Sequence, residues 1–304
     1  MPAPIALFVF NRPTHAANTL QHLAACEGAS RSDLYIFADG PRPQSPTDAA
    51  AVEETRAVCR AAKGFASVTL CEREQNMGLA ANITGGVGDV LAKHGRIIVL
   101  EDDIEVAPFF LRYMNSALDF YENRGVFSIS GYTPELVMPR DYQFSTYVMH
   151  RNCSWGWGTW AQEWDKVDWE VKSFDSFIRN ARQRSAFNEC GNDLTPFLLR
   201  WKKGAREMWD IVFCYAGFVH GRPTVYPRKS LVRNAGTDGT GSHAFADAKK
   251  YSSPLAANVS LSAFVPGVAP NQELLKQFHD FYSTSTLRLI YNTLMRWRYI
   301  LFGK

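Results

Sequence analysis

The sequence predicts a doubly wound α/β fold, in which a mostly parallel central sheet carries helices on both faces. Strand and helix patterns alternate from residue 5 to residue 122. The strand patterns are short and apolar, which is typical of parallel strands buried on both faces. The 304 residues are 46% hydrophobic and 21% charged, a composition that excludes a disordered or fibrous protein.

Strands and helices are expected in strict alternation through the first half of the chain. We expect strands at 5–10, 34–38, 66–71 and 96–100, and helices at 16–25, 52–62, 79–93 and 107–122. Turn-forming residues end the first two strands, namely Asn11-Arg12-Pro13 and Asp39-Gly40-Pro41. Because ligands of such sheets bind beyond the carboxyl ends of the strands, the residues after each strand are the first candidates for a site.

The pattern changes after about residue 125, where Gly, Trp and Pro separate shorter strand patterns. We expect these strands at 127–130, 146–149 and 224–227. Residues 233–251 are rich in Gly, Ser, Thr and Asp, which is typical of a long mobile loop over an active site. No clean linker separates the halves, so we expect one compact domain of two parts.

Net charge and cysteine content limit the partners and the cellular location that we expect. The net charge is +3, from 33 basic and 30 acidic residues spread along the chain, so no nucleic acid is expected as a partner. No apolar run reaches the roughly 18–20 residues of a membrane span. The first residues do not match a signal peptide, and the six cysteines lack a C-x-x-C pair. Together these features predict a cytoplasmic protein with reduced thiols.

Residues 287–302 combine apolar and aromatic side chains with arginines and contain no acid. This pattern is typical of a basic amphipathic helix lying on an anionic membrane surface. The alternative is a helix packed on the core or on a second subunit. We expect peripheral attachment to the inner face of the membrane.

Three consecutive carboxylates, Glu101-Asp102-Asp103, follow the apolar strand at 96–100. At about 5 Å and an effective dielectric of about 20, each pair would repel by roughly 3 kcal/mol, so a compensating cation is expected. Hard oxygen ligands suit Mg²⁺ or Mn²⁺ better than zinc. The alternative is a solvated first turn of the helix that follows, where acids are also favoured.

Residues 97–110 read Ile-Ile-Val-Leu-Glu-Asp-Asp-Ile-Glu-Val-Ala-Pro-Phe-Phe and resemble the donor-binding segment of the N-acetylglucosaminyltransferase I family. These are inverting glycosyltransferases of the GT-A fold. Residues 8–13 and 37–40 resemble the family's first two strand ends. Residues 154–158 and 208–210 are similar to its Gly-x-Gly-Trp turn and its Trp-Asp, and 226–230 to a strand before a flexible loop. The chain departs from the family at Ile211, where a second aspartate is expected, and in the acceptor region.

The resemblance implies a Rossmann-like GT-A domain. Residues 1–125 would form the nucleotide-sugar-binding half and residues 126–250 the acceptor-binding and catalytic half of the same domain. Residues 251–304 would form a C-terminal segment with the basic amphipathic helix.

The resemblance also implies a role for each matching residue. Asp103 would bind Mn²⁺ or Mg²⁺, and Asp210 would act as the catalytic base, although other acids of the Trp-rich half compete for that role. Candidate donor-binding residues are Arg12, Asp39 (reading the uracil), Asn76, Asn82, Glu101, Asp102 and Trp157. His243 is a candidate loop contact. Arg12 and Asp39 also suit ordinary turns, His243 an ordinary surface position, and the Trp cluster an ordinary core.

The expected function is therefore a metal-dependent inverting transfer of a sugar, GlcNAc or a related hexose, from a UDP-sugar to a glycan or lipid-linked saccharide. The absence of an anchor suits a bacterial enzyme of cell-surface polysaccharide synthesis. One alternative is a sugar nucleotidyltransferase, which would need a Gly-rich basic loop after its first strand. Others are a retaining transferase and a non-catalytic carbohydrate-binding or membrane-associated protein.

Overall fold

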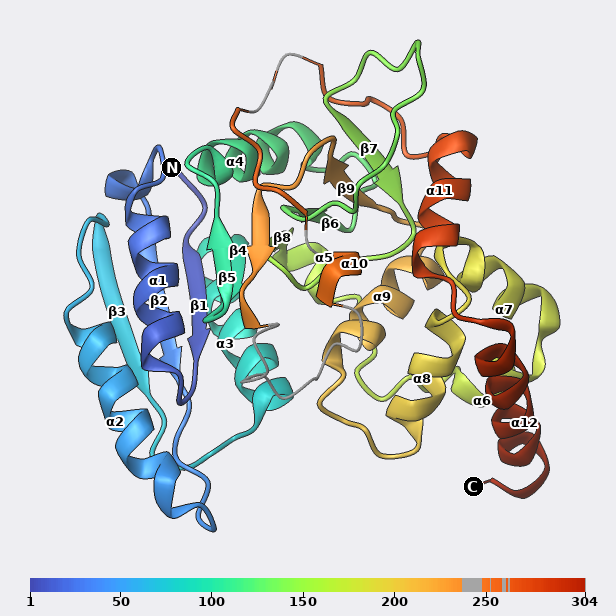
Figure 1. The fold of residues 1–304 in the computed structure, drawn as a ribbon, viewed down its shortest axis with the longest axis horizontal. Helices are drawn as coiled ribbons and strands as arrows, with labels where there is room; N and C mark the ends of the chain where they lie inside the picture. The colour runs from blue at the N-terminus through green and yellow to red at the C-terminus, as the bar shows by residue number, and fades with distance from the viewer. Residues whose placement is uncertain (237–247, 252, 259–260, 262, 304) are drawn as a thin grey trace.

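The computed structural model describes residues 1–236, 248–251, 253–258, 261 and 263–303. Its main feature is an eight-stranded sheet with strand order β3-β2-β1-β4-β8-β6-β9-β7, flanked by helices (Figure 1). The predicted α/β class is therefore confirmed.

The first half of the sheet is parallel. It consists of β1 (Ile5–Val9), β2 (Asp33–Ala38), β3 (Ser67–Glu72) and β4 (Arg96–Glu101). β1 pairs with β2 on one side and with β4 on the other, so Phe8 lies opposite both Phe37 and Glu101. The carboxyl ends of these strands consequently meet at one edge of the sheet.

Helices cover both faces of the parallel half. They are α1 (Pro13–Ala24), α2 (Pro46–Arg60), α3 (Leu79–His94) and α4 (Phe110–Tyr121). Alternate residues of β1 belong to different cores: Ala6 and Phe8 pack with α3, while Leu7 packs with α1 and α4. The period-two alternation of a strand thus divides the apolar residues between two layers.

The second half of the sheet is mixed. β8 (Trp157–Trp160) is antiparallel to β4 and to β6 (Ser128–Ser130), whereas β9 (Thr224–Pro227) is parallel to β6. β7 (Thr146–Met149) closes the sheet antiparallel to β9. The smaller mixed half was predicted, but β8 was not, because its alternating Trp and Gly residues looked like a turn.

Further helices pack beside this half. They are α5 (Ala161–Trp164), α6 (Phe174–Arg179), α7 (Ala181–Phe187), α8 (Leu194–Lys202), α9 (Trp209–Val219), α10 (Ala248–Tyr251), α11 (Gln272–Tyr282) and α12 (Thr286–Phe302), with 3-10 turns at Ala29–Arg31 and Asn188–Cys190. α12 packs against α6 and α8 (Figure 1). Within the described ranges, no helix is both long enough and apolar enough to cross a membrane.

A two-stranded ribbon connects the acidic triplet to the second half. β5 (Ile104–Val106) follows the triplet directly and pairs antiparallel with β10 (Val232–Asn234). The predicted helix at 107–122 therefore begins later, at Phe110. Of the predicted loop at 233–251, residues 237–247 lie outside the described part of the chain, and His243 is among them.

Candidate functional site

The acidic triplet lies at the carboxyl end of β4, in the turn between β4 and β5. Glu101 is the last residue of β4, and Asp102 is buried, with 3% of its surface exposed. The Thr19 hydroxyl of α1 donates a 2.7 Å hydrogen bond to the Asp102 carbonyl oxygen. The backbone N–H of Phe10 donates a 3.4 Å hydrogen bond to Asp102 Oδ2. β1, α1 and β4 therefore fix the position of the triplet together.

Arg12 bridges two of the three carboxylates. Its Nη2 donates to Asp102 Oδ1 and, at 3.0 Å, to Asp103 Oδ2. Its Nη1 is buried and has no hydrogen-bond partner among the described residues. A Cβ placed on Gly236 would lie 3.2 Å from Nη1 and would overlap the Asp103 carboxylate. The glycine after β10 therefore permits the close approach of this backbone to the pair.

Burial and mutual repulsion dominate the electrostatics of the triplet. Burial, followed by the charges of Asp103, Asp102 and Asp210, raises the pKa of Glu101 well above its usual range. Burial likewise raises the pKa of Asp102 to about 6, against the opposing effect of Arg12. A site of this kind favours a cation that restores the ionised carboxylates.

Asp210 lies close to the triplet although it is far away in sequence. It occupies the first turn of α9 and is half-buried. Its charge acts on both Glu101 and Cys153. The structure thus brings together Arg12, Glu101, Asp102, Asp103 and Asp210, all of which were sequence candidates.

Trp157 is not a ligand-stacking residue, which corrects the sequence interpretation. Only 2% of its surface is exposed, and its ring packs on Trp164, Trp209 and Phe213 at centroid distances of 5.0–6.0 Å. The flanking glycines do not open the rings to solvent either. A Cβ on Gly158 would lie 2.8 Å from the carbonyl oxygen of Ile97, so this glycine allows close packing of β8 on β4.

Trp155 is better placed than Trp157 to meet a ligand. β8 begins at Trp157, which pairs with Val99 of β4, so Trp155 lies just before the strand rather than in it. Trp155 is half-buried and packs edge-on against Tyr132 and Tyr251. The sequence could not show that Trp157 enters a strand and is buried there.

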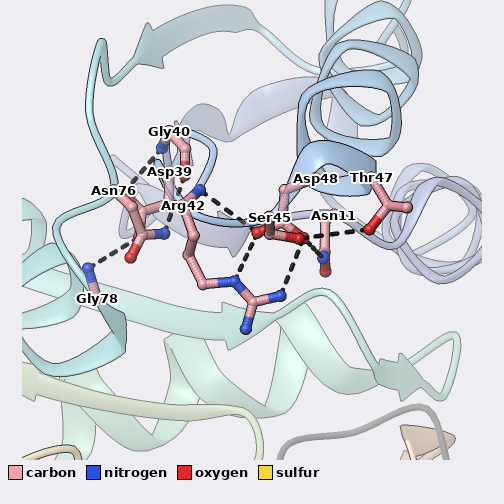
Figure 2. A network of polar contacts seen from close by, with 9 residues as sticks. All are labelled: Asn11, Asp39, Gly40, Arg42, Ser45, Thr47, Asp48, Asn76 and Gly78. Atoms are coloured by element: carbon pink, nitrogen blue, oxygen red, sulfur yellow. Dashed lines mark hydrogen bonds and ion pairs between the residues drawn. The ribbon is translucent and has the colours of Figure 1, made fainter.

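Asp39 anchors a loop, and this corrects its predicted role of reading a base. Its Oδ1 accepts hydrogen bonds from the N–H groups of Gly40 (2.9 Å) and Met77 (2.8 Å). Its Oδ2 accepts from Asn76 Nδ2 and from the N–H of Gly78, both at 3.1 Å (Figure 2). A carboxylate has about four acceptor positions, and this network uses all of them.

The two candidate asparagines also make internal contacts. Asn76 donates a second hydrogen bond, of 2.9 Å, to the carbonyl oxygen of Gly40 (Figure 2). Asn82 is a buried residue of α3, and its Oδ1 accepts a 3.3 Å hydrogen bond from Arg73 Nε. Asn82 is therefore a packing residue, and Asn76 holds the loop that borders the strand ends.

Sequence reasoning missed a second polar cluster beyond β1 and β2. Arg42 donates from Nε and Nη2 to the two carboxylate oxygens of Asp48, at 2.5 and 2.9 Å, and Asn11 Nδ2 donates to Asp48 Oδ1 at 3.0 Å (Figure 2). The hydrogen bonds from Arg42 lower the pKa of Asp48 well below its usual range. The guanidinium also lies 5.3 Å from the centroid of the Phe10 ring. The sequence does carry a signal for this cluster. A basic residue stands in Pro41-Arg42-Pro43, a few residues after the predicted strand at 34–38.

The donor set fits a Mg²⁺ or Mn²⁺ ion that is shared with a phosphate ligand. Among the described residues, no group of three or more His, Cys, Asp and Glu side chains forms a metal cage. Mg²⁺, however, is usually held by one or two carboxylates plus substrate phosphates and water. Asp103 offers such a carboxylate, and the unpaired Arg12 Nη1 offers a donor to a phosphate oxygen.

A cavity of about 890 Å³ lies beyond the carboxyl ends of β6 and β9. Its walls come from residues 133–138, 227–230 and 253–258, with Gln143 and Ser145. Residues 133–145 and 227–230 belong to the half for which acceptor binding was predicted, whereas residues 253–258 belong to the predicted C-terminal segment.

Comparison with known proteins places the chain far from characterised relatives. No family model and no curated protein matches it. S. aureus TarS is similar over 75% of this chain and 36% of its own chain, with 12% identity and a TM-score of 0.40. A cytidylyltransferase from Leptospira borgpetersenii serovar Hardjo-bovis (strain JB197) is similar over 55% of this chain and 64% of its own, with 11% identity and a TM-score of 0.34.

Both similarities span less than two thirds of the solved chains. At these TM-scores they support no functional conclusion, and membership of the N-acetylglucosaminyltransferase I family stays a prediction. Function is therefore inferred from the residues of the site.

Proposed function

We propose that this protein is a metal-dependent inverting glycosyltransferase that moves a sugar, GlcNAc or a related hexose, from a UDP-sugar to a glycan or lipid-linked saccharide. One observation carries the proposal. The end of β4 gathers the triplet and Asp210 near a single guanidinium, that of Arg12, whose Nη1 has no hydrogen-bond partner in the part of the chain that the structure describes. This combination suits a divalent cation and a diphosphate together.

Asp103 would hold Mn²⁺ or Mg²⁺ through its carboxylate, and Arg12 Nη1 would donate to a phosphate oxygen. When bound, the cation neutralises the charge that develops on a departing nucleoside diphosphate. Asp102, predicted from the sequence as a donor contact, is buried against Arg12 and would position the guanidinium. Glu101 remains the triplet residue that faces Asp210 and would contact the donor sugar.

Asp210 would act as the general base. It would accept the proton of an acceptor hydroxyl while that oxygen attacks the anomeric carbon and the bond to the diphosphate breaks. Because the attack comes from the face opposite the leaving group, the configuration inverts. Trp155, which is half-buried just before β8, would offer part of its ring to the sugar.

The proposal is tested by calorimetric titration of UDP into the wild type, with and without Mn²⁺. We expect binding that requires the metal, and loss of that binding in Asp103→Ala. Asp89→Ala is the matched control, because Asp89 is an exposed aspartate of α3 away from the strand ends.

Metal-independent binding of UDP, or unchanged binding in Asp103→Ala, would remove the role assigned to the triplet. A sugar nucleotidyltransferase would instead release pyrophosphate from UTP and a sugar phosphate. The connection after β1 argues against that activity, because α1 begins at Pro13 and leaves only residues 10–12 to surround a triphosphate.

A further inference from the structure

The helix α12 carries an unusual concentration of exposed apolar side chains. Of the 15 large hydrophobic residues that are exposed in the described chain, eight lie on this one helix. Six of them recur at helical spacing and form one face, here called the apolar stripe: Leu287, Ile290, Tyr291, Leu294, Trp297 and Leu301. An exposed stripe of this size marks an interaction surface.

The opposite side of α12 is already occupied. The Tyr299 hydroxyl donates a 3.1 Å hydrogen bond to Asp175 of α6, and Arg179 donates to the carbonyl oxygen of Ile300 at 3.2 Å. The ring of Tyr299 packs edge-on against Phe174 at 5.4 Å. These contacts fix the inner side of α12 on the body of the protein. The apolar stripe therefore faces outward in the folded protein.

The charges around the stripe indicate what covers it. Residues 285–303 contain three arginines and no acid. Arg298 is exposed and lies eleven residues after Leu287, which places it on the face of the stripe itself. Arg288 is also exposed, with its guanidinium 5.2 Å from the ring centroid of Tyr291. On the inner side, burial followed by the charge of Arg296 lowers the pKa of Arg184, so cations are concentrated here as well.

A second copy of the helix is a poor partner for this face. Pairing two stripes would bury Arg298 from each copy, and neither helix supplies a carboxylate to compensate it. An anionic lipid surface accepts both features, because apolar side chains enter the acyl boundary while arginines reach the phosphates. We propose that the apolar stripe of α12 docks the protein on an anionic phospholipid surface, with the helix lying in the plane of the interface.

The test is flotation of the full-length protein with vesicles of phosphatidylcholine, alone or mixed with phosphatidylglycerol. We expect the wild type to float with the mixed vesicles and to be released by high salt. The double variant Leu294→Ser/Trp297→Ser should bind at least about tenfold more weakly, since two large apolar side chains no longer enter the boundary. Its matched control is Val219→Ser/Val268→Ser, two exposed valines outside α12, which should bind as the wild type does.

The arginine is tested separately. Arg298→Gln should weaken partition onto mixed vesicles about fivefold, as expected for one cation near an anionic surface. Arg140→Gln, an exposed arginine outside α12, should have no effect. Equal binding to neutral and mixed vesicles, or no binding to either, would overturn the proposal.

Light scattering gives a further outcome. A wild-type dimer that Leu294→Ser/Trp297→Ser converts to a monomer would assign the stripe to a second copy and overturn the lipid proposal. None of these measurements uses nucleotide or metal, so their outcome is independent of the proposed transferase activity.

Discussion

The carboxylates around Arg12 can carry more negative charge than its single guanidinium can neutralise. It bonds Asp102 and Asp103 through one amino group, while Glu101 and Asp210 add their charges nearby. Such an imbalance at a partly buried strand end is costly unless a cation joins the carboxylates. We therefore expect a cation to bind beside these carboxylates, and a phosphate ligand would accept a hydrogen bond from Arg12 Nη1, which has no partner among the described residues.

The base assignment predicts a selective loss of turnover. Asp210→Asn keeps the shape of the side chain but cannot accept a proton, so the rate of sugar transfer should fall about 10²- to 10⁴-fold. Metal-dependent affinity for UDP should change little, because the donor is held by Asp103 and Arg12. Steady-state rates and UDP titrations on the same protein give the two values.

Asp165→Asn is the control for this prediction, because Asp165 is an exposed aspartate of the same Trp-rich half. It should leave turnover unchanged. Near-normal turnover in Asp210→Asn would assign the base to another residue.

The Asp39 carboxylate predicts a stability effect. Asp39→Asn replaces one acceptor oxygen by an NH₂ group that would face N–H donors of residues 40 and 76–78. We expect the free energy of unfolding to fall by about 2 kcal/mol or more, as for lost hydrogen bonds to a charged group. Denaturant unfolding measures the change. Asp89→Asn, on the exposed face of α3, should fall within about 0.5 kcal/mol of the wild type.

At the scale of elements, the two adjacent glycines of α3 should respond in opposite directions. A Cβ on Gly86 would lie 2.8 Å from Phe8 Cε1 and 3.1 Å from Phe37 Cδ1, in the layer where these two rings stack. Gly86→Ala should therefore cost about 1–3 kcal/mol through overpacking. Gly85 is exposed and has no atom within 4 Å of its Cβ position, so Gly85→Ala should stabilise by about 0.5–1 kcal/mol.

Thermal or denaturant unfolding of the Gly85→Ala and Gly86→Ala variants measures these two changes in stability. A Gly86→Ala protein as stable as the wild type would show that α3 can move away from β1 and β2 at little cost. Both glycines lie within the helix predicted at 79–93, and α3 confirms that helix.

Elements with a strong local pattern could be predicted from the sequence, and those defined by distant partners could not. The buried strands and the amphipathic helices of the first half each have their own apolar period. They could therefore be predicted from the local sequence alone. β5 and β8 have three and four residues and owe their pairing to β10, β4 and β6. No local signal distinguishes such segments from a turn.

The same distinction applies to the site. The triplet was recognisable because three acids directly follow an apolar strand. The loop-anchoring role of Asp39 was not, because its donors at residues 76–78 come from a segment that the sequence does not place. Likewise, Trp155 and Trp157 differ only in which one lies inside β8, and that depends on the register with β4.

At the scale of the whole molecule, the sheet separates two apolar cores, and all six cysteines take part in or pack against them. Cys71, of β3, is also in contact with one core, but β3 is an edge strand with largely exposed residues. The rate at which a thiol reagent labels the protein therefore shows whether both apolar cores are folded.

Burial is the first cause that raises the pKa of Cys26 to about 11 and that of Cys59, Cys153, Cys190 and Cys214 to about 12. At pH 8 a thiol of pKa 12 is ionised in only about one molecule in ten thousand, and the thiolate is the reactive species. We therefore expect a disulfide-exchange reagent to label one thiol of the native protein rapidly and all six after unfolding.

The two half-buried cysteines, Cys71 and Cys153, should differ in how fast they are labelled. Cys71 lies on the edge strand β3, whereas burial first, and then the charges of Asp210 and Glu101 against the opposing effect of Arg151, raise the pKa of Cys153. Cys71→Ser should remove the fast phase, whereas Cys153→Ser should leave it intact. If Cys153→Ser removed the fast phase instead, the Cys153 thiol would be more open to solvent than its place between the two cores implies.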